Sequence, residues 1–186
     1  IATYAEFTRK LAEKILASGR RLTLVTPSPF DQYSDVNPNN IAFCNEPGLQ
    51  SCAQTVRKLA SAHNLGLVEF HRPFTALLKE HPELHLCGGD RVHPGAAGHL
   101  LMAALVLEAM GESGLVAQVA VDAVKGKVEK LKDGLTRNAV VTAVQATPKG
   151  VRFTYAPKAL PFPVSSAYRE AEAFYPITET FNRETL

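Results

Sequence analysis

Hydrophobic residues in the first part of the chain recur first at helical spacing and then as an unbroken run. Four apolar residues are three or four positions apart and predict one helix: Tyr4, Phe7, Leu11 and Ile15. Thr3 and Glu6 match a capping box at the start of this helix, with Thr3 as the N-cap, and Gly19 is placed to end it. Residues 22–26 follow as a short β-rich run. This run lacks polar alternation, which predicts a parallel strand buried on both faces.

The same patterns continue to about residue 111. They predict a strand at 65–70 and three further helices, at 50–63, 73–80 and 96–110. Helices that alternate with short apolar strands favour a parallel sheet with helices on both faces. In such sheets, ligands bind beyond the carboxyl ends of the strands, so the loops after residues 26 and 70 are expected near a site.

The last third of the chain, residues 112–186, is predicted to be a β-rich appendage to the α/β unit of residues 1–111. Strands are expected at 139–144 and 151–155, joined by a turn at 147–150. Residues 115–132 fit strands slightly better than a helix. Prolines after residue 156 are expected to interrupt regular structure, and a short helix is expected at 166–174.

A short segment rich in functional residue types lies before the helix predicted at 96–110. It reads Asp-Arg-Val-His-Pro at residues 90–94, and Gly98 and His99 follow. A histidine that acts as a general base needs a second group to orient it, and Asp90 is close enough in sequence to do this for His93. The alternative interpretation is a turn in which Asp90 caps the following helix. The longer pattern favours catalysis.

This segment resembles the last motif of the SGNH (GDSL-like) hydrolases, a family of esterases, lipases and carbohydrate deacetylases. The resemblance implies a Ser-His-Asp triad with His93 as base, Asp90 as its orienting partner, an ester or acetylated carbohydrate as substrate, and no cofactor. It also implies that residues 1–111 form part of a flavodoxin-like, three-layer α/β/α parallel sheet. Only the motif at 90–99 is specific, although the order of elements over 2–111 agrees with the family.

The family's nucleophile and oxyanion-hole motifs are absent from the sequence. No Gly-Asp-Ser occurs, residues 111–114 do not form a nucleophile elbow, and the asparagines at 37–40 lack the flanking residues of the family pattern. The serine is therefore expected on a missing N-terminal segment or on a separate chain. The competing hypothesis is a degenerate, non-catalytic relative that recognises carbohydrate or a protein partner.

The composition of the chain argues against some classes of partner but does not identify the function. The 186 residues are 46% hydrophobic and 20% charged, with a net charge of +2. These values are typical of a globular domain and predict no nucleic-acid partner. No apolar run is long enough to span a bilayer. The sequence assigns no compartment, and a secreted or periplasmic location is compatible with it.

Cysteines and histidines outside the motif allow two interpretations each. Cys44 and Cys52 flank a short loop, which suits a local disulfide or two buried thiols. His81, His85 and Cys87 have ligand types suited to zinc, but Pro82 interrupts the helix that would align them, so we predict no metal site.

Three residues on the predicted loops are candidates for contacting substrate. Phe30 and Tyr33 are suited to form an apolar platform or to pin their own loop. His71 follows a predicted strand and is expected either to contact substrate or to lie at a solvated helix start. Asp31, on the same loop as the aromatic residues, is expected to be solvated.

Overall fold

The computed structural model describes residues 1–34, 44–111, 114–129, 136–158 and 183–185. The first two ranges belong to one compact unit and the last three to another. The protein is a mixed α/β structure with small parallel and antiparallel sheets. In the described ranges, no helix combines the length and apolar character needed to cross a membrane.

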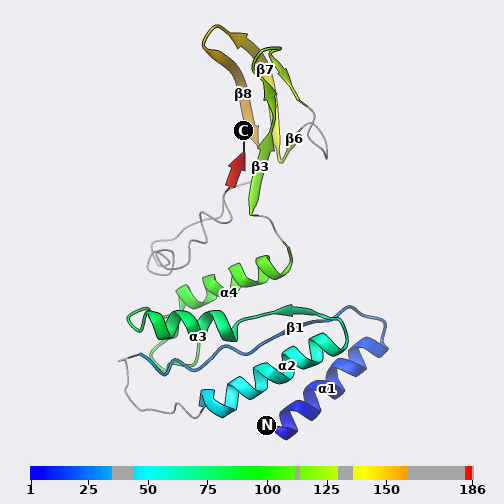
Figure 1. Cartoon of the computed structure of the whole chain (residues 1–186), viewed down its shortest axis with the longest axis vertical. Coiled ribbons are helices and arrows are strands. Elements are labelled where there is room, and N and C mark those ends of the chain that lie inside the picture. The colour runs from blue at the N-terminus through cyan, green and yellow to red at the C-terminus, as the bar shows by residue number, and fades with distance from the viewer. Residues whose placement is uncertain (35–43, 112–113, 130–135, 159–182, 186) are drawn as a thin grey trace. The chain divides into compact units, whose positions relative to one another are not determined.

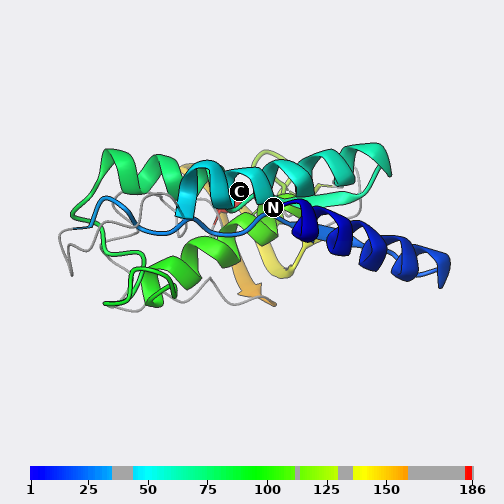
Figure 2. The same ribbon diagram turned by 90° about the horizontal axis from the view of Figure 1, so that it is seen from below.

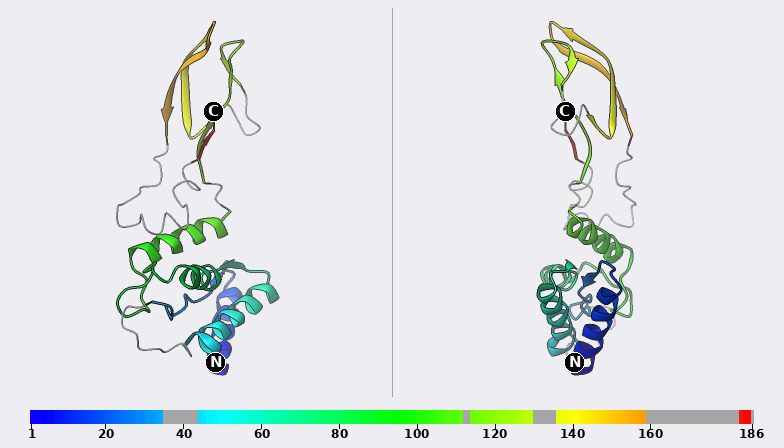
Figure 3. Two further views of the ribbon diagram at one scale, coloured as in Figure 1. Left: turned by 60° about the vertical axis from the view of Figure 1, so that its left-hand side comes forward. Right: turned by 90° about the vertical axis from the view of Figure 1, so that its right-hand side faces the viewer.

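The first unit has the predicted alternation of helices and parallel strands. Its elements are α1 (Ala2–Ala17), β1 (Thr23–Val25), the π-helical turn η2 (Asn45–Leu49), α2 (Gln50–Ala62), β2 (Gly66–Val68), α3 (His71–Glu80) and α4 (Ala96–Ala109). Strand β1 pairs with β2 in parallel, with Leu24 opposite Leu67. Helix α4 lies on one side of this strand pair, and α1 and α2 lie on the other (Figures 1 and 3).

The core of the first unit forms where α3 and α4 pack against β2 and the segment before the Asp90 loop. Seven buried apolar residues make up this core: Val68, Phe74, Leu78, Leu84, Leu86, Leu101 and Leu105. Helix α2 buries Ala53, Val56, Leu59 and Ala60, as its spacing predicts. The core thus fixes the two ends of the segment that carries the predicted catalytic residues.

The first helix is confirmed, but two predictions for the N-terminal region are wrong, the capping box of α1 and the burial of β1 on both faces. The N-cap of α1 is Ile1 and makes no side-chain cap, so Thr3 lies inside the helix and forms no capping box. The predicted apolar stripe faces outward, with Phe7 64% and Leu11 61% exposed, because α1 runs beside α2 and buries only the small Ala12 (Figure 2). Strand β1 is not buried on both faces, since Val25 is 44% exposed.

The second unit consists of strands. They are β3 (Leu115–Val119), β4 (Val121–Asp122), β5 (Lys127–Val128), β6 (Thr136–Arg137), β7 (Ala139–Thr147), β8 (Gly150–Pro157) and β9 (Arg183–Thr185). Pairing is antiparallel for β3 with β6, β4 with β5 and β7 with β8, and parallel for β3 with β9. The strand interpretation of 115–128 and the turn at 147–150 are confirmed. Pro157 belongs to β8, so regular structure continues one residue further than predicted, and the helix expected at 166–174 lies outside the described residues.

Candidate functional site

Asp90 and His93 form a hydrogen-bonded pair on the loop before α4. His93 Nδ1 lies 2.5 Å from Asp90 Oδ2. The other carboxylate oxygen, Oδ1, accepts hydrogen bonds of 3.0 Å from the backbone N–H groups of Val92 and His93. The hydrogen bond from the His93 ring, assisted by these two N–H groups, holds the pKa of Asp90 well below its usual range. Asp90 therefore stays ionised and orients the imidazole.

The pair is open to its surroundings. The His93 side chain is 83% exposed and that of Asp90 is 53% exposed. Because Asp90 accepts the proton on Nδ1, Nε2 carries the lone pair and is available to take a proton from a nucleophile. Among the described residues, no hydroxyl group hydrogen-bonds to the His93 ring.

Backbone hydrogen bonds close the Asp90–His93 loop on itself. Gly88 N–H donates to the His93 carbonyl, Arg91 N–H donates to the Gly88 carbonyl, and Gly95 N–H donates to the Leu86 carbonyl, each at 2.8 Å. An isolated bridge between Cys87 and Pro94 joins the two ends of the loop. The exposed pair is thus held by a fixed backbone rather than by burial.

Arg91 anchors the same loop to the loop that follows β1. Arg91 has a φ of +64° and is 3% exposed, and its Nε donates a 2.7 Å hydrogen bond to the Asp31 carbonyl. Asp31 N–H returns a 2.9 Å bond to the Arg91 carbonyl, and the Arg91 guanidinium lies 4.8 Å from the Phe30 ring centroid. Sequence reasoning assigned no role to Arg91. The feature of the sequence that could have indicated this role is the position of Arg91 between Asp90 and His93.

Asp31 is buried, contrary to the prediction that it is solvated. It is 1% exposed, and its Oδ1 accepts hydrogen bonds from the N–H groups of Tyr33 and Ser34. Its carboxylate therefore shapes the loop after β1.

The motif requires glycine at position 98 because a side chain there would clash with the neighbouring backbone. A Cβ atom at this position would lie 2.3 Å from the Leu86 carbonyl oxygen and 2.9 Å from the Pro94 Cβ. Only glycine permits this close approach of α4 to the segment before the loop. His99, the next residue, is exposed, and the N-cap of α4 is Gly95.

The predicted aromatic platform is split between two cavities. Phe30 is 5% exposed and lines an apolar cavity of about 570 Å³, together with Pro29, Leu49 and Val92, the residue before His93. Tyr33 lines a different, polar cavity, so the two aromatic residues do not share a surface.

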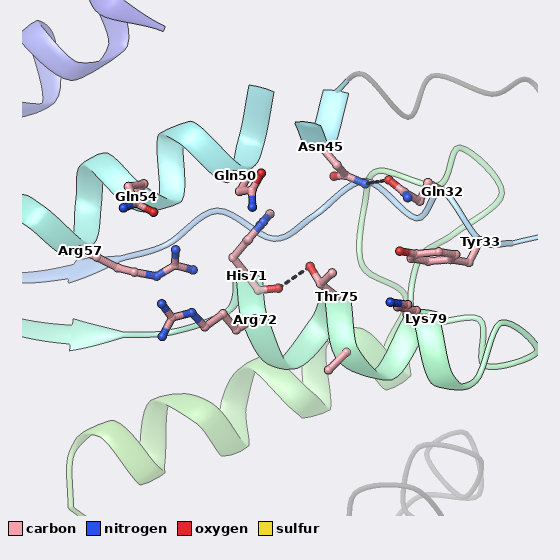
Figure 4. Close-up of a pocket in the computed structure, with 11 residues that line it drawn as sticks. Gln32, Tyr33, Asn45, Gln50, Gln54, Arg57, His71, Arg72, Thr75 and Lys79 are labelled. Atoms are coloured by element: carbon pink, nitrogen blue, oxygen red, sulfur yellow. Dashed lines mark hydrogen bonds between the residues drawn. The ribbon is translucent and has the colours of Figure 1, made fainter. Parts of the chain in front are cut away.

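His71 lines the polar cavity with Tyr33 and is not at a solvated helix start (Figure 4). Helix α3 begins two residues earlier than predicted, because Thr26 Oγ1 accepts the backbone N–H groups of Phe70 and His71. His71 is 6% exposed, and its Nδ1 has no hydrogen-bond partner among the described residues. Burial, assisted by the charge of Arg57, lowers the pKa of His71, so this imidazole is neutral near pH 7.

An ion pair beside His71 was not predicted from the sequence. Arg57 Nε lies 2.6 Å from Glu69 Oε2, and Thr26 Oγ1 lies 2.8 Å from Glu69 Oε1. Burial alone raises the pKa of Glu69, but the hydrogen bonds from Arg57, Thr26 and the Arg72 backbone outweigh it and lower the pKa to about 2. These residues are far apart in sequence and form no motif.

All three cysteines are free thiols, and the thiol of Cys87 is kept protonated. Cys44, Cys52 and Cys87 are free thiols, so the disulfide interpretation of the first two is not supported. Burial, with smaller effects from Asp31 and Asp90, raises the pKa of Cys87 to about 11, which keeps this thiol protonated. Within the described ranges, no group of three or more ligating side chains is arranged for a metal ion.

Comparison with known proteins supports the fold. No protein-family profile matches the chain, and no curated protein is similar to it. Among solved structures, the chain is similar to BT4096, a gut microbial diltiazem-metabolizing enzyme, with a TM-score of 0.68 and 22% sequence identity. The similarity covers 97% of this chain and 46% of that chain. The chain therefore has the fold of part of an enzyme and spans about half of that enzyme's length.

Proposed function

We propose that the chain supplies the histidine and aspartate of a serine ester hydrolase of the SGNH type, with an ester or acetylated carbohydrate as substrate. The observation that carries this proposal is the 2.5 Å contact between His93 Nδ1 and an Asp90 carboxylate that two backbone N–H groups hold in place. A carboxylate in this position fixes the tautomer of the imidazole and stabilises its charged form.

In the proposed reaction, His93 transfers the proton and Asp90 stabilises the charged form of its ring. Nε2 of His93 accepts the proton of a serine hydroxyl as its oxygen attacks the ester carbonyl. The resulting imidazolium, paired with Asp90, then donates this proton to the leaving alkoxide. Hydrolysis of the acyl-enzyme repeats both transfers with water in place of the serine.

We assign the serine and the oxyanion-hole donors to residues outside the 186. Apolar surface in the first unit supports this assignment, since Phe7 and Leu11 on α1 and Val25 on β1 are exposed. Exposed strand edges and apolar helix faces are normally covered by a further segment. The segment that bears the serine covers these apolar residues.

Labelling with a fluorophosphonate probe tests the proposal. In the intact protein or complex from which the chain derives, the probe should modify a serine outside these 186 residues, and His93→Ala should abolish the modification. The purified chain alone should hydrolyse p-nitrophenyl acetate no faster than its His93→Ala variant. His93-dependent turnover by the chain alone would show that the nucleophile lies within it. Absence of labelling in the intact protein would favour a non-catalytic binding module.

A further inference from the structure

The polar cavity around His71 has the side chains of a ligand-binding site that the hydrolase chemistry does not use. Its volume is about 350 Å³, within the range of small-molecule pockets. It lies among α2, α3 and the loop after β1. Eleven residues line it, and they include three cations and no carboxylate: Gln32, Tyr33, Asn45, Gln50, Gln54, Arg57, His71, Arg72, Thr75, Ala76 and Lys79.

Positive charge in the cavity is only partly compensated. Arg57 is paired with Glu69, whereas Arg72 and Lys79 form no ion pair with any described residue. In Figure 4, the guanidinium groups of Arg57 and Arg72 lie toward one end, and Lys79 and Tyr33 lie toward the other. Because the exposed side chains of Arg72 and Lys79 are not paired with a described carboxylate, the cavity attracts an anionic group even though His71 is neutral.

The unpartnered Nδ1 of His71 is suited to accept a hydrogen bond from a ligand hydroxyl group. An interaction with the Pro27 backbone raises the pKa of the His71 ring, and Nδ1 has no partner, so we place the N–H of the neutral ring on Nε2. Nδ1 of the neutral ring then carries a lone pair and is an acceptor. In Figure 4 the ring points toward Gln50, at the middle of the cavity. A buried acceptor without a donor is costly, and a ligand hydroxyl would satisfy it.

Amide and aromatic side chains also line the cavity. Asn45 donates a 2.6 Å hydrogen bond to Gln32 Oε1, which leaves the NH₂ group of Gln32 as a donor, and Gln50 and Gln54 supply further amides. Amides donate and accept at once, as a series of hydroxyl groups requires. The Tyr33 ring at one end offers a flat apolar face.

We propose that this cavity binds a carboxylated sugar unit, with Arg72 contacting the carboxylate and His71 Nδ1 accepting a sugar hydroxyl. The amides contact the remaining hydroxyls. The site would serve a substrate-recognition role in a hydrolase and a primary role in a binding module, so binding does not depend on hydrolysis.

Direct binding to the purified chain tests this inference. Titration calorimetry should show that D-galacturonate or D-glucuronate binds at least about tenfold more tightly than D-galactose and D-glucose, a difference of about 1.4 kcal/mol. Arg72→Ala should weaken binding of the acidic sugar about tenfold or more. Arg20→Ala is the matched control, because Arg20 is exposed and does not line the cavity. On addition of the acidic sugar, the ¹⁵N signal of His71 Nδ1 should shift.

Five results would overturn the proposal, four of them from the titrations with sugars and variants. These four are equal affinity for acidic and neutral sugars, no detectable binding of either acid, an Arg72→Ala variant that binds like Arg20→Ala, and an unchanged His71 Nδ1 signal at saturation. Inorganic phosphate that binds as tightly as the acidic sugar would identify a plain anion site and would also exclude the sugar assignment.

Discussion

His93 and His71 belong to the same unit but lie in opposite environments. His93 is 83% exposed on its side chain and hydrogen-bonded to a carboxylate, whereas His71 is 6% exposed as a residue and has an unpartnered nitrogen beside a cation. A carboxylate partner stabilises the charged imidazole, and burial beside an arginine disfavours it. The first histidine is therefore equipped to move a proton, and the second to remain neutral and accept a hydrogen bond.

The largest expected difference between the two histidines is catalytic. If the proposed function holds, His93→Ala should reduce the rate of p-nitrophenyl acetate hydrolysis by the intact protein by about 10⁴-fold or more, because the proposed base is removed, and Asp90→Asn should also cause a large loss. His99→Ala is the matched control, since it removes an exposed imidazole six residues away. If H93A and H99A have equal activity, His93 is not the base.

The packing that holds the His93 loop should be sensitive to a single methyl group. Gly98→Ala places a Cβ 2.3 Å from the Leu86 carbonyl oxygen, so we expect a loss of about 3 kcal/mol in the free energy of unfolding. Gly89→Ala, with no atom within 4 Å of the added Cβ, should change this free energy by less than about 0.5 kcal/mol. Urea unfolding of both variants measures the difference. Similar midpoints would show that the α4 contact does not fix the loop.

The ion pair beside His71 should contribute to the acid sensitivity of the first unit. The pKa of Glu69 is lowered from 4.5 to about 2, so its stabilising contribution is complete above pH 4.5 and is lost as the pH falls toward 2. The expected loss is about 2–3 kcal/mol, and Glu69→Gln should flatten this part of the profile. Urea unfolding at a series of pH values gives the slope. An unchanged slope in the variant would assign the acid sensitivity to other groups.

The smallest expected effect is a shift in the titration of His71 itself. Its pKa lies below the usual 6.5, because burial and Arg57 outweigh Glu69. The unfolded chain therefore gains this proton first, and a small further loss of stability begins as the pH falls through 6.5. NMR titration of the His71 ring measures the midpoint. Glu69→Gln should lower it further by removing the attractive carboxylate, and a raised midpoint would contradict this account.

Local patterns predicted most of the elements of the first unit and the hairpin turn of the second. The helices at 50–62 and 96–109, the two short strands and the turn at 147–150 follow from apolar spacing and glycine or proline positions. The Asp90 and His93 pair was also predictable, because three residues of separation on a turn bring the two side chains together. These features depend on neighbours in sequence.

Features that depend on distant residues were missed or placed wrongly. Asp31 is buried because Arg91, 60 residues later, bonds to its carbonyl, and α3 starts at His71 because Thr26, 45 residues earlier, accepts its N–H. The apolar residues of α1 were recognised from their helical spacing, but this spacing does not determine whether another surface covers them. The periodicity of hydrophobic residues contains no information about such partners, which are distant in sequence.

The sequence by itself thus determined the order of elements and the pairing of an aspartate with a histidine, since both follow from local spacing and local backbone geometry. Only the tertiary structure decided that His71 is buried beside Arg57 and that Phe30 and Tyr33 line separate cavities. The physical reason is that burial and electrostatic environment are set by residues that meet through folding, and these environments decide what chemistry each side chain can perform.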